Sequence, residues 1–250
     1  MDTTSPTRVV VVTGAGTGIG RATARAFAGQ GATVVAVGRR KEPLRETAEG
    51  HPGIHRLVAD VTAEGAAEQI VDATVTAHGG LDVLVNNAGI SSGGPLGTLD
   101  RSVIAPLLET NLVAPVLLTQ AAVPALKESR GVVVNVSTTI GQRGWPANSV
   151  YPATKSALET LTRCWALELA PAGVRVVAVA PGAIDTPIAD HTGLSPERLE
   201  ALRAWQLAHT PLGRLGRPEE VARVITSLAA PDAGFLTGAV VPVDGGALVT

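Results

Sequence analysis

Short valine-rich runs alternate along the chain with longer segments in which apolar residues recur at helical spacing. This alternation predicts successive βαβ units and a parallel sheet. Several runs are apolar at consecutive positions, which is typical of strands covered by helices on both faces. No repeat, low-complexity tract or linker divides the sequence, so we expect one domain over residues 1–250, a doubly wound α/β sheet of about seven parallel strands. The predicted strands lie near residues 8–12, 32–37, 54–58, 81–85, 131–136, 174–179 and 239–243.

One predicted helical segment, residues 99–127, contains Pro106, Pro115 and Pro124. A proline inside a helix removes a backbone hydrogen bond and clashes with the preceding turn. We therefore expect a kink or a break in this helix.

A glycine-rich stretch follows the first predicted strand and opens the first helix. It reads Thr13-Gly14-Ala15-Gly16-Thr17-Gly18-Ile19-Gly20. Such glycines allow a turn with positive φ, leave room for a pyrophosphate and permit close strand–helix packing. The helix N-terminus adds N–H donors and partial positive charge for an anion. Because Ile19 replaces the third glycine of G-x-G-x-x-G, a purely structural turn is the alternative to a dinucleotide site.

The single tyrosine, Tyr151, precedes Lys155 by four residues. On a helix these positions share a face, so the phenol and the ammonium can meet over a common substrate. The alternative is a half-buried tyrosine beside a solvated lysine.

Composition narrows the function classes. Apolar residues make up 45% of the chain and charged residues 17%, with a formal net charge of −2. These values are typical of a soluble globular domain and provide no basic stripe for nucleic acid. We also expect no signal peptide, because residues 1–7 are polar, and no apolar run of membrane-spanning length.

The sole cysteine, Cys164, cannot form an internal disulfide and suits a reducing cytoplasm, where we expect it to be a small buried hydrophobe. His51 and His55 are four residues apart, but they lie in a predicted loop without clustered Asp, Glu or Cys. We therefore expect a surface loop and no metal site there.

Taken together, these motifs resemble those of the short-chain dehydrogenase/reductase family, in its subgroup of about 250 residues. The resemblance extends from residue 9 to residue 246, and its specificity comes from the order and intervals of the motifs. They are Thr13 to Gly20, Asp60-Val61, Asn86-Asn87-Ala88-Gly89, Asn111, Tyr151-x-x-x-Lys155, Pro181-Gly182 with Thr186-Pro187, and Val243-Asp244-Gly245-Gly246.

The resemblance implies hydride transfer between a nicotinamide cofactor and a ketone or secondary alcohol. Tyr151 would be the proton donor or acceptor, Lys155 its electrostatic partner and Asn111 the anchor of a water relay. A free tyrosine titrates near 10, so acid/base work at neutral pH requires about 4 kcal/mol of stabilisation of the phenolate. An ammonium about 4 Å away supplies about that much at an effective dielectric near 20. We therefore expect the pair to lie in a shielded cleft.

Two positions depart from the family pattern. Thr138 stands thirteen residues before Tyr151, where the family normally has a serine. We assign to Thr138 the hydrogen bond to the substrate oxygen, with Ser137 as the alternate, because neighbouring side chains on a strand point in opposite directions. Pro152 follows the tyrosine and is tolerated in the first turn of a helix.

The end of the second predicted strand bears on the choice of cofactor. An NAD enzyme of this kind usually has Asp or Glu where Gly38 stands, whereas Arg39, Arg40 and Lys41 follow here. Guanidinium groups bind a 2′-phosphate through paired hydrogen bonds. We therefore expect a preference for NADP(H), with NAD(H) possible; the alternative is a solvated basic start to the next helix.

The resemblance also implies the remaining cofactor contacts. For Asn87, a structural role in tying the central strands together is weighed equally with a cofactor contact. The implied contacts are Gly14, Gly16, Thr17, Gly18, Ile19 and Gly20 at the pyrophosphate, Asp60 and Val61 at the adenine, Asn86, Ala88 and Gly89 along the adenosine ribose, and Tyr151, Lys155, Pro181, Gly182, Ile184 and Thr186 at the nicotinamide end.

The substrate end is less well determined. The resemblance implies a lid over about 186–210, which orders around the ligand. Its apolar residues either line a pocket or form the dry side of amphipathic helices; they are Ile188, Leu194, Leu199, Leu202, Trp205 and Leu207. The predicted substrate contacts are Ser91, Thr138, Trp145 and Tyr151. Trp145, together with Ile90, Ser91, Ser92 and Leu96, favours an uncharged ketone or secondary alcohol as the substrate. Arg143 leaves room for an acidic group on that substrate.

Three further expectations concern partners. Reduction of 3-oxoacyl groups on a carrier protein is an alternative activity, but that acidic partner requires a basic rim, for which Arg130, Arg143 and Arg175 are scattered candidates. A non-catalytic, cofactor-binding regulatory relative is the alternative of a different class. A homotetramer is implied by the resemblance, with apolar interfaces from a helix carrying Leu158, Leu161, Trp165 and Leu169 and from the tail 245–250.

Overall fold

The computed structural model describes residues 7–142, 147–187 and 195–249. Seven strands form one sheet in the order β3-β2-β1-β4-β5-β6-β7, and every pairing is parallel. The doubly wound fold and all seven predicted strands are confirmed, with ends within about two residues of the predictions. The strands are β1 Val9–Thr13, β2 Thr33–Gly38, β3 Ile54–Val58, β4 Val83–Asn86, β5 Val132–Val136, β6 Arg175–Pro181 and β7 Val240–Val243.

The strand order reverses beside β1. The chain first proceeds outward through β2 and β3 and then returns to β4 on the other side of β1. The loops that leave the carboxyl ends of β1 and β4 therefore diverge and leave a crevice, the usual ligand site of such sheets.

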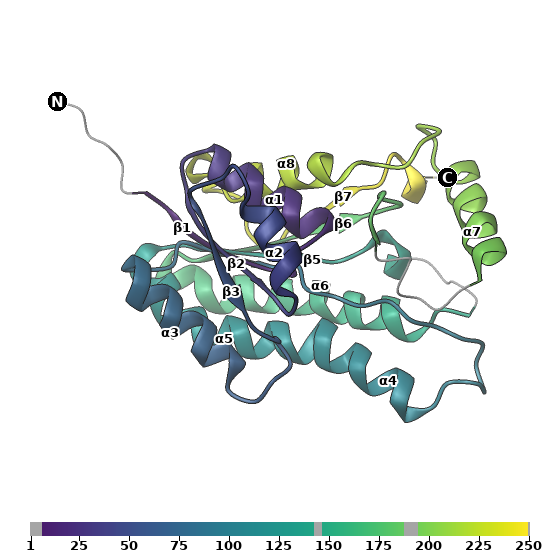
Figure 1. Cartoon of the computed structure of the whole chain (residues 1–250), viewed down its shortest axis with the longest axis horizontal. Helices are drawn as coiled ribbons and strands as arrows, with labels where there is room; N and C mark the ends of the chain where they lie inside the picture. The colour runs from purple at the N-terminus through teal and green to yellow at the C-terminus, as the bar shows by residue number, and fades with distance from the viewer. Residues whose placement is uncertain (1–6, 143–146, 188–194, 250) are drawn as a thin grey trace.

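Helices cover both faces of this sheet (Figure 1). On one face lie α1 Gly18–Gly29, α2 Lys41–Ala48 and α8 Pro218–Leu228, and on the other lie α3 Ala66–His78, α5 Ala114–Ser129 and α6 Val150–Leu169. Neighbouring valines of one strand enter opposite cores, because side chains alternate along a strand. Val10 and Val12 pack in the core with Phe27 and Ile225, whereas Val11 packs in the core with Leu126.

A π-helical turn interrupts the α-helical hydrogen bonding of the proline-containing stretch, in place of the kink or break that was expected. α4 Arg101–Leu108 is followed by a π-helical turn at Glu109–Val113, and α5 then continues. Pro106 lies inside α4, Pro115 lies in α5 directly after the π turn, and Pro124 lies farther along α5. A π turn widens the helix and is frequent at functional sites. Here it contains Asn111, which is fully buried.

The expectation about apolar length was wrong for this helical stretch. Within the described residues, Arg101–Ser129 is long and apolar enough to cross a membrane by length and composition, with a hydropathy of 1.5 in its most apolar window. One third of that window is buried inside the fold. Core helices of soluble proteins meet the same criterion, so the finding is weak support for a membrane span.

Two expectations about α6 were also wrong. Cys164 is exposed rather than buried. Leu158 and Leu169, proposed for a subunit interface, are buried in this chain, whereas Leu167 is 80% exposed. Hydrophobicity alone did not determine which of the apolar residues of α6 face the sheet.

Candidate active site

The main cavity, of about 980 Å³, lies beyond the carboxyl ends of β4, β5 and β6, beside α7 Pro196–Ala208. Such a volume is in the range of small-molecule sites. Trp145, a predicted substrate contact, lies outside the described residues, as do Arg143, Ile188 and Leu194. The cavity brings together the predicted residues Ile19, Gly89, Ser91, Thr138, Tyr151, Lys155, Pro181, Gly182, Ile184 and Thr186.

The glycine turn forms a surface that a pyrophosphate fits. Gly14 and Gly18 have φ of 63° and 51°, a region that favours glycine. A Cβ on Gly14 would stand 2.9 Å from the Ala88 Cα, and a Cβ on Gly20 would overlap the Gly14 carbonyl oxygen. Thr17 begins α1 without a side-chain capping hydrogen bond. The first N–H groups of α1 are thus free to bind an anion.

Two residues that the sequence analysis missed hold this turn in place. The Arg21 guanidinium donates from Nε to the Gly16 carbonyl oxygen at 2.9 Å and forms an ion pair with Glu46 at 2.7 Å. The buried Thr47 hydroxyl donates to the Ala15 carbonyl oxygen at 2.9 Å. The contacts of Arg21 with Glu46 and of Thr47 with Ala15 link the turn and α1 to α2, over more than twenty residues of sequence. The contact of Arg21 with Gly16 is local, and an arginine directly after the last glycine could have suggested it.

Tyr151 and Lys155 are both buried on the first turns of α6, with 8% and 4% of their surface exposed. The Lys155 ammonium donates to the Val136 carbonyl oxygen at 2.8 Å. The Tyr151 hydroxyl is hydrogen-bonded to the side chain of Thr138. Pro152 lies in the first turn of α6, so it does not interrupt the helix that carries the pair.

Thr138 and Ser137 point in different directions at the end of β5. The Thr138 hydroxyl faces Tyr151 and lies 3.3 Å from the Pro181 carbonyl oxygen. The Ser137 hydroxyl instead donates to the buried Glu159 carboxylate at 2.7 Å. This geometry favours Thr138 over Ser137 as the hydroxyl next to the reacting group, and its catalytic role stays a prediction.

Asn111 is fixed by the loop that follows β4. Its Nδ2 donates to the Ile90 carbonyl oxygen and its Oδ1 accepts from the Ile90 N–H, both at 2.9 Å. A Cβ on Gly89 would stand 3.3 Å from both the Asn111 Oδ1 and the Lys155 Nζ. The Asn111 and Lys155 side chains therefore both lie next to Gly89, on the side where a Cβ would point, and the water relay stays a prediction.

The shielded position expected for the pair is present, but in the free chain it does not lower the pKa of the phenol. Burial raises the pKa of the Tyr151 phenol above its usual range, and the hydrogen bond from Thr138 opposes this only in part. Burial also lowers the pKa of the Lys155 ammonium to about 8. The loss of hydration disfavours both charged forms. At neutral pH the phenol therefore keeps its proton.

The Asn86 side chain has a structural role, and its implied contact with the adenosine ribose stays a prediction. Its Nδ2 donates to Thr119 Oγ1 at 3.0 Å and to Asn135 Oδ1 at 2.9 Å, and Asn135 in turn donates to Thr162 at 2.9 Å. This buried network ties β4 and β5 to α5 and α6. Only the backbone of Asn86 is therefore free to contact a cofactor.

Asn87 has the tying role that the sequence suggested. Its Nδ2 donates to the Thr13 carbonyl oxygen at 2.8 Å, and the Thr13 hydroxyl accepts from the N–H groups of Asn87 and Ala88, each at 3.0 Å. These contacts join the ends of β1 and β4 at the crevice.

Basic side chains lie at the end of β2, where the predicted adenosine contacts gather. Arg39 is 68% exposed and pairs with Asp60 at a long 3.8 Å. Asp60 accepts from the N–H and the hydroxyl of Thr62, and these hydrogen bonds help to lower its pKa although burial opposes them. Arg40 is exposed at the start of α2, and Val61 packs partly against the core. The Arg39 guanidinium is thus accessible to a ligand.

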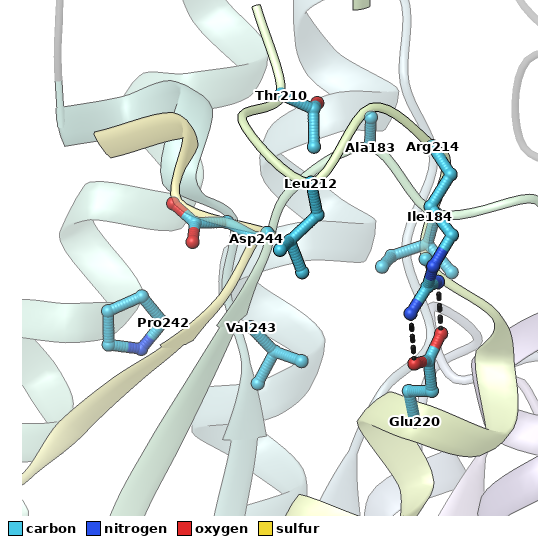
Figure 2. Close-up of a pocket in the computed structure, with 11 residues that line it drawn as sticks. Ala183, Ile184, Thr210, Leu212, Arg214, Glu220, Pro242, Val243 and Asp244 are labelled. Atoms are coloured by element: carbon cyan, nitrogen blue, oxygen red, sulfur yellow. Dashed lines mark hydrogen bonds and ion pairs between the residues drawn. The ribbon is translucent and has the colours of Figure 1, made fainter. Parts of the chain in front are cut away.

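A smaller cavity of about 270 Å³ lies behind the loop that follows β6 (Figure 2). Arg214 reaches across it to Glu220 with two hydrogen bonds of 2.7 and 2.8 Å, which lower the pKa of that carboxyl to about 2. The Gly216 N–H donates to the Ala183 carbonyl oxygen at 2.9 Å. This cavity shares Ala183, Ile184 and Thr210 with the main one, and Ile184 is a predicted contact at the nicotinamide end.

The predicted lid is partly described. On α7, Leu199, Leu202 and Trp205 line the main cavity, whereas Leu207 does not. The His209 ring stacks on Trp205 with centroids 3.8 Å apart and planes 9° apart. Within the described residues, no three His, Cys, Asp or Glu side chains gather as metal ligands.

Comparisons with known proteins agree with this geometry. The model of a family described as enoyl-(acyl carrier protein) reductase matches residues 14–247. The 3-oxoacyl-[acyl-carrier-protein] reductase FabG of Thermotoga maritima is 40% identical over 247 residues, 97% of this chain and 98% of the relative. L-xylulose reductase of Bos taurus is 36% identical over 252 residues, 100% of both chains.

One solved structure with a similar fold contains a nicotinamide cofactor. The 3-ketoacyl-(acyl-carrier-protein) reductase from Brucella melitensis complexed with NADH has a TM-score of 0.88 and 32% identity, covering 96% of this chain and 98% of that one. The chain belongs to the short-chain dehydrogenase/reductase family. It is an oxidoreductase of the class that acts on CH–OH and C=O groups.

Proposed function

We propose that the chain transfers a hydride between NADP(H) and the carbonyl carbon of a small free ketone, or the matching secondary alcohol, with Tyr151 as the acid/base group. The observation that carries the proposal is the buried set of Thr138, Tyr151 and Lys155 in the same cavity that Ile19 of the glycine turn lines. One continuous space can therefore hold both a dinucleotide and a substrate.

The side chains supply the proton chemistry. When bound, a reduced nicotinamide supplies the hydride. The Tyr151 phenol, which keeps its proton at neutral pH because burial raises its pKa, donates that proton to the carbonyl oxygen as negative charge develops there. The Thr138 hydroxyl donates a hydrogen bond to the same oxygen. Alcohol oxidation is the reverse of this step, in which the Tyr151 phenolate accepts the proton from the alcohol.

The preference for NADP(H) rests on the end of β2. Gly38 provides no carboxylate for a ribose hydroxyl, and Arg39 is exposed with only a long ion pair to Asp60. A guanidinium there can bind a 2′-phosphate through paired, charge-assisted hydrogen bonds. We expect kcat/KM to be at least about tenfold higher with NADPH than with NADH.

Substitutions in β2 test this preference. Arg39→Asp should lower kcat/KM for NADPH by about ten- to a hundredfold and leave NADH turnover largely intact. Gly38→Asp should raise the preference for NADH, because it supplies a carboxylate for the ribose hydroxyl. The fold should tolerate it, because a Cβ on Gly38 would stand 3.4 Å from the Leu44 side chain, an ordinary contact. Arg163→Asp, an exposed arginine on α6, is the control. An unchanged cofactor ratio in Arg39→Asp would refute the assignment.

The carrier-protein alternative has less support from the arginines named for it. Arg175 is committed to the backbone, because its guanidinium donates to the carbonyl oxygens of Leu228, Ala230 and Leu236 at 2.8 to 3.2 Å. We therefore favour a free small molecule, and comparing a 3-oxoacyl carrier protein with free ketones as substrates tests this choice. The non-catalytic alternative is disfavoured by the intact Asn111, Tyr151 and Lys155. The cytoplasmic location and the homotetramer remain proposals, to be checked by fractionation and by sedimentation.

A further inference from the structure

The substrate end of the main cavity has a polar wall whose side chains bind no other part of the described chain. Ser91 and Ser92 follow β4, Asn148 precedes Tyr151 by three residues, and all three line the cavity. Within residues 7–142, 147–187 and 195–249, no hydrogen bond involves these three side chains. The hydroxyls of Ser91 and Ser92 are thus available to a ligand in the cavity, and the Asn148 carboxamide can turn toward one.

The Asn148 carboxamide is the most unusual of the three. Its Oδ1 is buried and has no hydrogen-bond partner among the residues that the structure describes. It lies against Gly93, 3.3 Å from the place that a Cβ on Gly93 would take. Buried polar atoms without partners are rare in folded proteins and call for an explanation. Rotation of the carboxamide exchanges its oxygen and nitrogen, so Asn148 can present either a donor or an acceptor to a bound molecule.

The backbone beside Asn148 is strained and closely packed. Ala147 has a φ of 58°, an uncommon conformation for a residue with a Cβ. Gly93 approaches so closely that a Cβ there would stand 2.6 Å from the Ala147 carbonyl oxygen. Such conformations cluster at binding and catalytic sites because the surrounding structure must hold them. Here this conformation brings Asn148 to the cavity wall.

The other described walls of the cavity favour neither a charged ligand nor a fully apolar one. On α7, Leu199, Leu202 and Trp205 add apolar surface. Apart from Lys155, the charged side chains that line the described part of the cavity are of both signs; they are Asp185, Glu200 and Arg203. A cavity with a polar wall, an apolar wall and no dominant charge fits a neutral molecule with hydroxyl groups on one side.

We propose that the substrate is a neutral ketone that carries hydroxyl groups near its carbonyl, as an open-chain ketose or a cyclic hydroxyketone does, and that Asn148 determines this specificity together with Ser91 and Ser92. The inference rests on the proposed function. A hydroxyl group both donates and accepts, so it can satisfy the carboxamide and the serine hydroxyls. A deoxy analogue leaves those groups unpaired, and sites built to bind a hydroxyl discriminate against such analogues.

Matched substrate pairs test the proposal. NADPH oxidation is followed with 2-hydroxycyclohexanone against cyclohexanone, and with L-xylulose against 2-pentanone. We expect kcat/KM to favour the hydroxylated member of at least one pair by tenfold or more. Asn148→Ala and Asn148→Ser should reduce that ratio by about tenfold, whereas Gln30→Ala, at an exposed position after α1, should not change it. NADPH binding by each variant shows whether it is folded.

The outcomes separate this inference from the function beneath it. Reduction of both members of each pair with equal efficiency, or a ratio that Asn148→Ala and Asn148→Ser leave unchanged, would overturn the specificity and leave the reductase activity standing. NADPH oxidation with none of the four ketones, by a protein that binds NADPH, would overturn both the proposed function and this inference for these substrates.

Discussion

Replacing Lys155 with methionine should stabilise the free protein, by an amount that depends on pH. Burial lowers the pKa of Lys155 from 10.5 to about 8. At 1.36 kcal/mol per pH unit, keeping the ammonium in this site costs about 3 kcal/mol at pH 7. The lost contact with the Val136 carbonyl oxygen offsets about 1 kcal/mol of the gain at every pH.

The sign follows from proton binding. Between pH 8 and 10.5 the unfolded chain binds the Lys155 proton and the folded chain has released it, so the stability of the wild type rises with pH in that window. The Lys155→Met variant has no ammonium at this position, so its stability lacks this dependence on pH. The advantage of Lys155→Met over the wild type should therefore shrink by about 2 kcal/mol between pH 7 and pH 9.5.

Urea unfolding of the wild type and the variant at pH 7.0, 8.0 and 9.5 measures the effect through the change in midpoint. The exposed Lys127→Met on α5 is the matched control, because its side chain is not desolvated on folding. Loss of turnover in Lys155→Met shows that the same residue is needed for activity. An advantage that stays constant, or grows, as the pH rises would refute the burial argument.

Three other changes have defined outcomes. Gly20→Ala should abolish NADPH binding and lower the melting temperature, because the new Cβ overlaps the Gly14 carbonyl oxygen; fluorescence titration and thermal unfolding measure this. Thr138→Ala should lower kcat by about a hundredfold while Ser137→Ala mainly lowers stability by leaving Glu159 without its 2.7 Å partner; the reverse pattern in steady-state kinetics would show that the assignment is wrong. Asn111→Leu should lower kcat more than it raises KM, since it releases Ile90 and removes the predicted relay; unchanged kcat would exclude that relay.

The sheet was predictable because local sequence determines it. Short runs of valine at consecutive positions are typical of strands covered on both faces, and β1 and β5 are fully buried as expected. The interruption near Asn111 was predictable because prolines disfavour a continuous helix. Its form, a π turn that places Asn111 beside Ile90, depends on packing against another element and could not be read from the proline pattern.

The errors concern burial and long-range partners. The spacing of Tyr151 and Lys155 gave their shared helix face but not the depth of their burial, which reverses the direction expected for the phenol pKa. The partners of Asn86 lie 33 and 49 residues away, so its structural role was invisible in the motif that contains it. Cys164 was misplaced because the helical face it occupies is fixed by how α6 lies on the sheet.

The positioning residues had weak sequence signals. Arg21 directly follows the glycine motif, yet its ion pair with Glu46 appears only when α2 packs beside α1. Glu159 follows Lys155 by four residues and reads as an ordinary helix residue until burial and the hydrogen bond from Ser137 set it apart. Asn148 could be suspected only from its nearness to Tyr151.

Direct observation of hydride transfer tests the central claim. NADPH deuterated at the transferring position is mixed with a ketone that the protein reduces, and the alcohol is examined by mass spectrometry, with Tyr151→Phe as the control. We predict one deuterium on the carbinol carbon of the product from the wild type, and turnover at least about a thousandfold lower in Tyr151→Phe. Product without deuterium on that carbon, or equal turnover in Tyr151→Phe, would contradict the account.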